Sequence, residues 1–244
     1  MISVIKNSYK FELKSDEKDL DSFKSEFLKN DEFIIIPKFL SDGLISEIQL
    51  EVEKTKSDAH RTYIPNHKKG GSVPRPILEK KSPTLISLYT SDTLLKFFDA
   101  ITDKELLPCP KRDLHACALY LYTEEGDHIN YHFDTSYYKG ERYTALLGVI
   151  NQSRSVLDYE LFHKKKDREV SSGSAAIEPG TLVFFNGDKL RHRVTPSAAG
   201  DERIVVTFEY VTNSDMPIIN KFISNMKDAI AYFGFRKVFG RSGL

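Results

Sequence analysis

The chain has 244 residues, 40% of them hydrophobic, which is enough for one large domain with a substantial core. Its 35 Lys and Arg residues balance its 35 Asp and Glu residues, so the overall charge favours neither nucleic acid nor a membrane surface as a partner. The sequence predicts no signal peptide, no run of roughly 18 apolar residues that would span a membrane, and no disulfide framework. We therefore expect a soluble protein of the reducing cytoplasm.

The first part of the chain is predicted to be mainly helical. Apolar residues at helical spacing predict helices at 17–29, at 41–58 with Ser41 as the N-cap, and at 82–102. A β-branched run at 31–37 that ends in proline predicts one buried strand between the first two helices. These helices are expected to support a second, strand-rich part of the chain.

The segment 66–76 is expected to be irregular. Lys68 and Lys69 fit a solvated turn, because no aromatic residues interleave with them as they do in nucleic-acid-binding patches. Two prolines flank Arg75 and are expected to hold it in an extended loop beside this glycine-rich stretch.

From residue 113 onward the hydrophobic period becomes that of strands, and turn signals such as Glu125-Gly126 separate short segments. The expected strands are 114–122, 127–132, 143–150, 157–163, 174–178, 181–185, 189–195 and 203–211. Eight short strands without an intervening helix predict a closed or double-sheet antiparallel architecture of the jelly-roll kind.

We therefore expect a single α+β domain over residues 1–244. Its core would be a double-stranded β-helix, a jelly-roll or cupin-like barrel, over 113–211, with the helices of 1–112 as a buttress. Residues 212–244 would add a C-terminal helix whose aromatic side chains are candidates for a lid.

Three residues of the strand region form a candidate metal site. Two imidazoles, His132 and His192, with the carboxylate of Asp134 are the ligand set that holds non-haem Fe(II) and leaves the opposite positions open. His-x-Asp alone often arises by chance. Here it occurs together with Arg203, on a strand whose face should point inward, where an arginine can hold the distal carboxylate of a dicarboxylate co-substrate.

This pattern of His132, Asp134, His192 and Arg203 on a strand barrel resembles the Fe(II)/2-oxoglutarate-dependent oxygenases. The stretch 128–149 is more narrowly similar to the group that halogenates or hydroxylates free cationic amino acids such as lysine. The resemblance implies Fe(II), 2-oxoglutarate and O2 as cofactor and co-substrates. In the halogenases a small residue replaces the carboxylate ligand so that chloride can bind. Asp134 fills that position, so the resemblance implies hydroxylation.

Strand alternation suggests further residues of the pocket. Thr207 and Glu209 share a face with Arg203. A carboxylate inside a barrel is unfavourable unless it is paired, so Glu209 is expected to meet a substrate ammonium or guanidinium, a protein cation, or water at the barrel rim. Tyr120 and Tyr122 are candidates for hydrogen bonds to 2-oxoglutarate, with core packing as the alternative.

Three more residues are candidates for binding the substrate. By alternation His128 and Asn130 share a face with His132, and so are expected to line the pocket, although His128 also fits an ordinary surface histidine. Arg75 resembles in placement the clamp that this amino-acid-modifying group uses for the substrate carboxylate, and a solvated loop arginine is the alternative.

The expected function is hydroxylation of an unactivated C–H bond of a free cationic amino acid (lysine, ornithine or arginine), with release of succinate and CO2. The chain has no Trp, unlike the Trp-bearing lid associated with the lysine-specific members of the group it resembles. Two alternatives remain. A prolyl-hydroxylase-like enzyme acting on a peptide would need an open groove, whereas a free-amino-acid enzyme would need a closed pocket with charges at both ends. A sensory barrel would bind a ligand without chemistry.

Overall fold

The computed structural model describes residues 17–217, which form helices on the outside of one 12-stranded antiparallel sheet. The helices are α1 (Glu17–Lys29), α2 (Asp42–Thr55), α3 (Arg75–Lys81), α4 (Pro83–Tyr89) and α5 (Asp92–Thr102), with a short 3-10 helix, η1 (Lys56–Asp58), after α2. The strands are β1 (Phe33–Ile36), β2 (His60–Ile64), β3 (Lys68–Val73), β4 (Leu107–Pro108), β5 (Cys117–Tyr122), β6 (His128–His132), β7 (Arg142–Gln152), β8 (Leu157–Leu161), β9 (Ser171–Ala175), β10 (Leu182–Asn186), β11 (Arg191–Val194) and β12 (Glu202–Val211).

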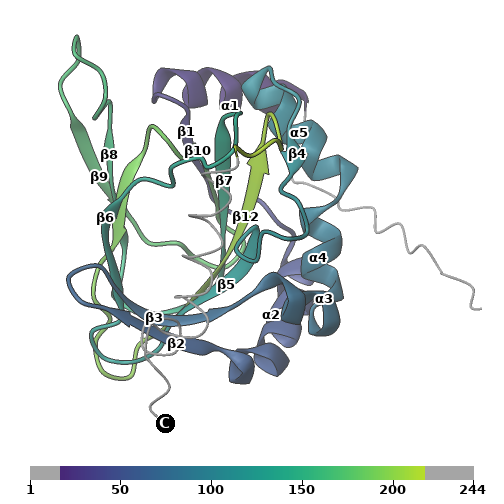
Figure 1. Ribbon diagram of the computed structural model, residues 1–244, viewed down its shortest axis with the longest axis vertical. Coiled ribbons are helices and arrows are strands. Elements are labelled where there is room, and N and C mark those ends of the chain that lie inside the picture. The colour runs from purple at the N-terminus through teal and green to yellow at the C-terminus, as the bar shows by residue number, and fades with distance from the viewer. Residues whose placement is uncertain (1–16, 218–244) are drawn as a thin grey trace, which may run out of the picture.

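The sheet curls so that its two halves face each other. Hydrogen-bonded neighbours run in the order β1-β10-β7-β12-β5-β3-β6-β11-β8-β9, and β3 joins the halves because it pairs with both β5 and β6. In Figure 1 the helices α2 to α5 cover one side of this sheet, and the β8–β9 hairpin projects on the opposite side. This α+β, jelly-roll-like half-barrel confirms the predicted architecture, and all eight strands predicted after residue 113 are present.

Strand β12 shows how alternation divides the interior in two. Ile204, Val206 and Phe208 belong to the larger hydrophobic core, which the helices share, whereas Val205 belongs to a second cluster between the two halves of the sheet. Period-two alternation of large apolar residues produces both sets from one strand. The face that carries Val205 is the face that forms the functional cavity.

The predicted helices are confirmed with one refinement. Ser41 caps α2, since its Oγ accepts a hydrogen bond from the backbone N–H of Leu44 at 3.4 Å. The helical region predicted at 82–102 consists of two helices, α4 and α5, because Ser91 forms a new N-cap that accepts from the N–H of Leu94 at 3.2 Å.

The prediction that 66–76 is irregular is wrong. Residues 60–73 form the β2–β3 hairpin, and β3 packs against β5. Two glycines weaken the strand pattern of this segment in the sequence. In the structure both lie where the backbone of β5 comes close. A Cβ on Gly70 would lie 3.2 Å from the Leu121 carbonyl oxygen, and one on Gly71 would lie 3.3 Å from the Leu121 Cβ. The glycine pair thus lets the two backbones approach closely.

Among residues 17–217, no helix has both the length and the apolar character that crossing a bilayer requires. The two cysteines, Cys109 and Cys117, are buried free thiols. The predicted C-terminal helix lies outside the described residues from position 218 onward.

Candidate metal centre

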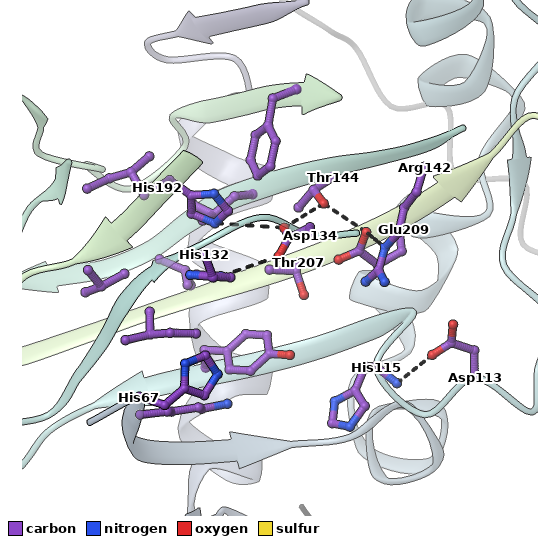
Figure 2. A pocket seen from close by; sticks show the side chains of 18 of the residues that line it. His67, Asp113, His115, His132, Asp134, Arg142, Thr144, His192, Thr207 and Glu209 are labelled. Carbon is purple, nitrogen blue, oxygen red and sulfur yellow. Dashed lines mark hydrogen bonds and ion pairs between the residues drawn. The ribbon is translucent and has the colours of Figure 1, made fainter. Parts of the chain in front are cut away.

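The predicted ligand triad comes together at the edge of the cavity between the two half-sheets. His132 ends β6, and His192 lies directly opposite it on the neighbouring strand β11, with ring centroids 4.2 Å apart. The Asp134 carboxylate lies 3.4 Å from Nε2 of His132 and 3.9 Å from Nε2 of His192. One ligand atom from each residue lies within 4.8 Å of the others (Figure 2). Strand pairing therefore brings together residues that are 60 positions apart in the sequence.

Both imidazoles are held in the orientation that a metal ligand needs. The Nδ1 of His132 is 2.8 Å from the backbone carbonyl oxygen of Asn130, and the Nδ1 of His192 is 3.4 Å from that of Leu190. Donation of the Nδ1 proton to a carbonyl fixes the tautomer and leaves the Nε2 lone pair available. The Nε2 atoms are the ones that face Asp134.

Electrostatics within the triad favours a charged carboxylate at Asp134. Burial by itself disfavours the charged form of Asp134, but His192 and His132 together hold its pKa well below the usual value. Burial and the neighbouring His132 lower the pKa of His192 to about 4. Burial disfavours the charged form of His132, but the hydrogen bond and the charge of Asp134, together with the backbone contact to Asn130, raise its pKa. One carboxylate thus stabilises positive charge at this place, as a divalent cation would require.

The expectation that His128 and Asn130 line the pocket is wrong. The β6–β11 register shifts between the His192–His132 pair and the Val194–Ile129 pair, so two residues of β6 oppose one of β11. This bulge places Ile129 on the cavity face together with His132. His128 instead approaches the Gly126 carbonyl oxygen with its Nδ1 at 2.7 Å.

Asn130 is exposed and lies outside the cavity for the same reason. Its side-chain amide donates to the backbone carbonyl oxygen of Asn66 at 2.8 Å. A strict period of two along the strand would have placed it inside. The local bulge overrides that pattern.

Asp134 sits in a loop that is held by close backbone contact and by one side chain. A Cβ added to Gly187 would lie 2.4 Å from the Asp134 carbonyl oxygen, so only glycine fits there. From the other side, Oγ1 of Thr144 lies 3.0 Å from Oδ2 of Asp134. The position of the carboxylate is thus set by groups from β7 and from the turn after β10.

A buried ion pair continues from this carboxylate. Thr144 Oγ1 also lies 2.9 Å from Oε2 of Glu209, which accepts a hydrogen bond from Nε of Arg142 at 2.8 Å (Figure 2). Burial raises the pKa of Glu209, against the opposing effect of Arg142. A protein cation was one of the partners expected for Glu209, and in the structure that cation is Arg142.

Arg142 and Thr144 were not predicted as site residues. They alternate with Leu146 on the inner face of β7, and all three line the cavity. The alternation that identified Thr207 and Glu209 on β12 would have identified them too, had it been applied to β7.

The cavity has a volume of about 460 Å³ and combines an apolar wall with a few polar groups. Four of the candidate site residues, Tyr120, Tyr122, Thr207 and Glu209, line it. This size and mixture are typical of a small-molecule site.

Arg203 is buried behind Tyr122, whose ring centroid is 5.1 Å from the guanidinium carbon. It is fully buried, and none of its three guanidinium nitrogens has a hydrogen-bond partner among the described residues. Burial lowers its pKa, although Tyr122 opposes the shift. A buried guanidinium without a partner among the described residues is unfavourable, which makes Arg203 a candidate for binding an anion.

Lys68 is a second cation of the cavity. Its ammonium lies 4.5 Å from the centroid of the Tyr120 ring, and the residue lines the cavity rather than a solvated turn. Burial lowers the pKa of Lys68 to about 8, against the effect of Asp134. Its expected place in a solvated turn is therefore wrong, because the β2–β3 hairpin folds it inward.

Arg75 does not lie in an extended loop, as was predicted. It begins α3 and is buried, with its Nε donating to Glu79 at 2.9 Å and its Nη1 to the Cys109 carbonyl oxygen at 3.1 Å. Its guanidinium also lies over the Tyr89 ring, at 5.2 Å. Both prolines were interpreted as loop signals. Proline is, however, compatible with the first turn of a helix, and Pro76 is the second residue of α3. These contacts direct Arg75 away from the cavity.

Comparison with known proteins yields no matching family model and no matching curated protein. Solved structures do match. The non-haem α-ketoglutarate-dependent epimerase SnoN of nogalamycin biosynthesis superposes with a TM-score of 0.66 at 14% identity, covering 80% of this chain and 82% of SnoN. The prolyl hydroxylase of Trichoplax adhaerens, in complex with a hypoxia-inducible-factor peptide, superposes with a TM-score of 0.63 at 14% identity, covering 86% of this chain and 98% of that one.

A prolyl-4-hydroxylase of Pseudomonas putida gives a TM-score of 0.57 at 15% identity and covers 80% and 98% of the two chains. At such low identity these similarities establish a shared fold. The curled antiparallel sheet with outer helices is therefore the fold of these 2-oxoglutarate-dependent oxygenases.

Proposed function

We propose that this protein is an Fe(II)- and 2-oxoglutarate-dependent dioxygenase that hydroxylates an unactivated C–H bond of a free, cationic amino acid. The proposal rests on two neighbouring features of the structure, the ligand triad and a buried arginine. The triad of His132, Asp134 and His192 lies at the cavity, and Arg203 lies behind the cavity wall with no partner among the described residues.

The donor set fits iron. Two imidazole nitrogens and one carboxylate oxygen are the ligand set that holds non-haem Fe(II) in oxygenases, and His132, His192 and Asp134 would supply it. Asp134 would supply the anionic ligand and occupy the position that a halide would otherwise need. When bound, Fe(II) supplies the activation of O2 that couples oxidation of 2-oxoglutarate to succinate and CO2 with oxidation of the substrate.

Arg203 would hold the distal carboxylate of 2-oxoglutarate. A guanidinium offers two parallel N–H donors to a carboxylate, and all three of its nitrogens lack a partner among residues 17–217. Tyr122 contacts Arg203 with its ring and also lines the cavity. Its hydroxyl would assist the guanidinium in orienting the dicarboxylate, with Tyr120 as its neighbour two residues along β5.

The remaining lining would bind the substrate and keep water out. Leu146, Leu157 and Val205 contribute an apolar wall that excludes water from the reacting bond. The carboxylate of Glu209 accepts two hydrogen bonds, both through Oε2. Its other oxygen, Oε1, makes no hydrogen bond to a described residue, which supports a role in accepting one from a substrate ammonium group.

The charged groups of the lining support a small amino-acid substrate rather than a peptide. The cavity is bounded by both anionic groups (Asp113, Glu209) and cationic groups (Lys68, Arg142), as a zwitterionic or cationic amino acid would require. The alternative, a prolyl-hydroxylase-like enzyme acting on a peptide, draws support from the two prolyl hydroxylases among the structures of similar fold. Both alternatives use the same metal centre and differ only in substrate.

A substrate screen tests the proposal. The protein is incubated with Fe(II), 2-oxoglutarate and each of the twenty amino acids plus ornithine, and with a proline-containing peptide, while succinate release and product mass are measured. The proposal expects succinate formation that is stimulated by a cationic amino acid, with a gain of one oxygen in that amino acid. Asp134→Gly should abolish hydroxylation. Full activity without iron would rule the function out. Stimulation by the peptide alone would favour the alternative substrate, and metal binding without turnover would favour a sensor.

A further inference from the structure

Lys68 occupies a position next to the metal centre. It pairs with Ile129 of β6, the strand that ends at His132. Its ammonium lies over the face of Tyr120, inside the cavity. Neither the fold nor the ligand triad requires a cation at this place.

Among the described residues, 17–217, the ammonium of Lys68 has no anionic partner. Within that range, Nζ of Lys68 makes no hydrogen bond or ion pair, and it lies over the Tyr120 ring. Asp134 is the acidic group whose charge most affects Lys68, and that carboxylate is already held between two histidines. By contrast, the Arg142 cation of the same cavity is paired with Glu209.

The neighbouring lysine on the same strand shows how an ordinary surface cation behaves here. Lys69 points to the other face of β3, where its Nζ donates to the Glu125 carbonyl oxygen at 2.7 Å and lies 3.9 Å from carboxylates of Glu124 and Asp127. Adjacent residues of a strand face opposite sides, so only Lys68 can reach the cavity. The two lysines form a matched pair for experiment.

Lys68 is half-buried, and even partial withdrawal of an ammonium from water without a counter-ion is unfavourable, since an aromatic face compensates only part of that loss. The Lys68 ammonium would be stabilised in the cavity by a ligand that carries a negative charge. A carboxylate is the anion that both the proposed co-substrate and an amino-acid substrate carry.

We propose that Lys68 is a carboxylate-binding residue of this cavity, contributing its ammonium to a carboxylate of the bound small molecules. The carboxylate belongs either to 2-oxoglutarate or to the amino acid that binds beside it. The inference rests on the proposed function for the identity of these two molecules, and the experiment separates the two sources.

The experiment uses full-length protein loaded with Ni(II), which holds the site without turnover. Lys68→Met and Lys68→Arg are compared with wild type, and Lys69→Met is the control. Calorimetry first measures the affinity for 2-oxoglutarate. It then measures, in the 2-oxoglutarate complex, the affinity for each cationic amino acid and for the amine that lacks its carboxylate. Circular dichroism confirms that each variant is folded.

Loss of one charge-assisted hydrogen bond predicts a weakening of about 10- to 100-fold in Lys68→Met, partly restored in Lys68→Arg and absent in Lys69→Met. If the affinity for 2-oxoglutarate falls, the carboxylate belongs to the co-substrate. If that affinity is unchanged but the amino acid weakens to the level of its amine, the carboxylate belongs to the substrate. If no amino acid binds to the wild type, the 2-oxoglutarate titration alone decides.

The inference is overturned if Lys68→Met binds 2-oxoglutarate and the amino acids as tightly as wild type does. That result would leave the proposed function intact. A wild-type protein that binds neither Ni(II) nor 2-oxoglutarate would instead refute the function. In that case protection of Lys68 from an amine-acylating reagent by acetate, read by mass spectrometry of the modified site, still tests whether the ammonium binds carboxylates: protection supports the inference, and its absence overturns it.

Discussion

Oγ1 of Thr144 lies 3.0 Å from Oδ2 of Asp134. The same oxygen lies 2.9 Å from a carboxylate oxygen of Glu209, which is paired with Arg142. A hydroxyl has one proton to donate, so its two carboxylate neighbours share it. This short chain links the proposed metal ligand to the charged end of the cavity.

Replacing Thr144 tests this link. Thr144→Val keeps the shape of the side chain and removes the hydroxyl, so Asp134 loses the group that orients it. We expect metal affinity to fall about 10- to 100-fold, as is usual when the partner of a metal-ligating carboxylate is removed. Anaerobic titration with Fe(II) measures the change, and Thr144→Ser should restore most of the affinity. Equal affinities in the valine variant and the wild type would show that Thr144 only packs.

Gly187 provides a steric test of the same loop. A methyl group at this position would lie 2.4 Å from the Asp134 carbonyl oxygen, so Gly187→Ala must displace the ligand loop. We expect reduced Fe(II) binding in a protein that is still folded, measured by titration together with thermal unfolding. Gly43→Ala is the control, because a Cβ there meets nothing within 4 Å and alanine favours the helix that contains it. If Gly187→Ala binds Fe(II) like the control, the loop does not need this close approach.

Strand periodicity predicted much of the architecture and of the metal centre. Val205, Thr207 and Glu209 lie on the cavity face because nothing interrupts the alternation of β12 over these residues. His128 and Asn130 were misplaced because a bulge between β6 and β11 shifts the register by one residue. A bulge depends on pairing between distant strands, which the periodicity of one strand does not reveal.

The N-terminal part was harder to predict for a different reason. The strand that carries Lys68 contains two glycines, which lower strand propensity, and their role appears only when β5 packs against them. Arg75 was expected in a loop because prolines flank it, yet the proline after it is compatible with the first turn of α3. In both cases tertiary packing, rather than local preference, determines the structure.

Arg203 offers a prediction about the co-substrate. Arg203→Met removes a buried charge that has no partner among the described residues, so we expect the variant to be as stable as the wild type or more stable. Its affinity for 2-oxoglutarate should nevertheless fall by at least about 100-fold, because a bidentate contact is lost. Thermal unfolding and calorimetry measure the two effects. A variant that binds 2-oxoglutarate normally would assign the guanidinium to another anion.

The lowered pKa of Glu32 leads to a prediction about how the free energy of unfolding depends on pH. Burial by itself would raise its pKa, but hydrogen bonds from Lys189, Asn186 and Tyr143 lower it to about 2, from 4.5 in the unfolded chain. The carboxylate therefore stabilises the fold above pH 4.5, and this contribution is lost as the pH falls towards 2. Glu32→Gln should be less stable at pH 7 by on the order of 2 kcal/mol and should show a weaker pH dependence over this range. Urea unfolding at several pH values is the measurement, and parallel curves for the two proteins would contradict it.

The most direct test of the central claim is anaerobic titration of the protein with Fe(II) and then 2-oxoglutarate, followed by the visible absorption that a chelated 2-oxo acid gives on Fe(II). The account predicts one Fe(II) bound per chain and a visible band that appears only when both are present. His192→Ala should lack the band. Absence of Fe(II) binding in the wild type, or an undiminished band in His192→Ala, would contradict the proposed oxygenase centre.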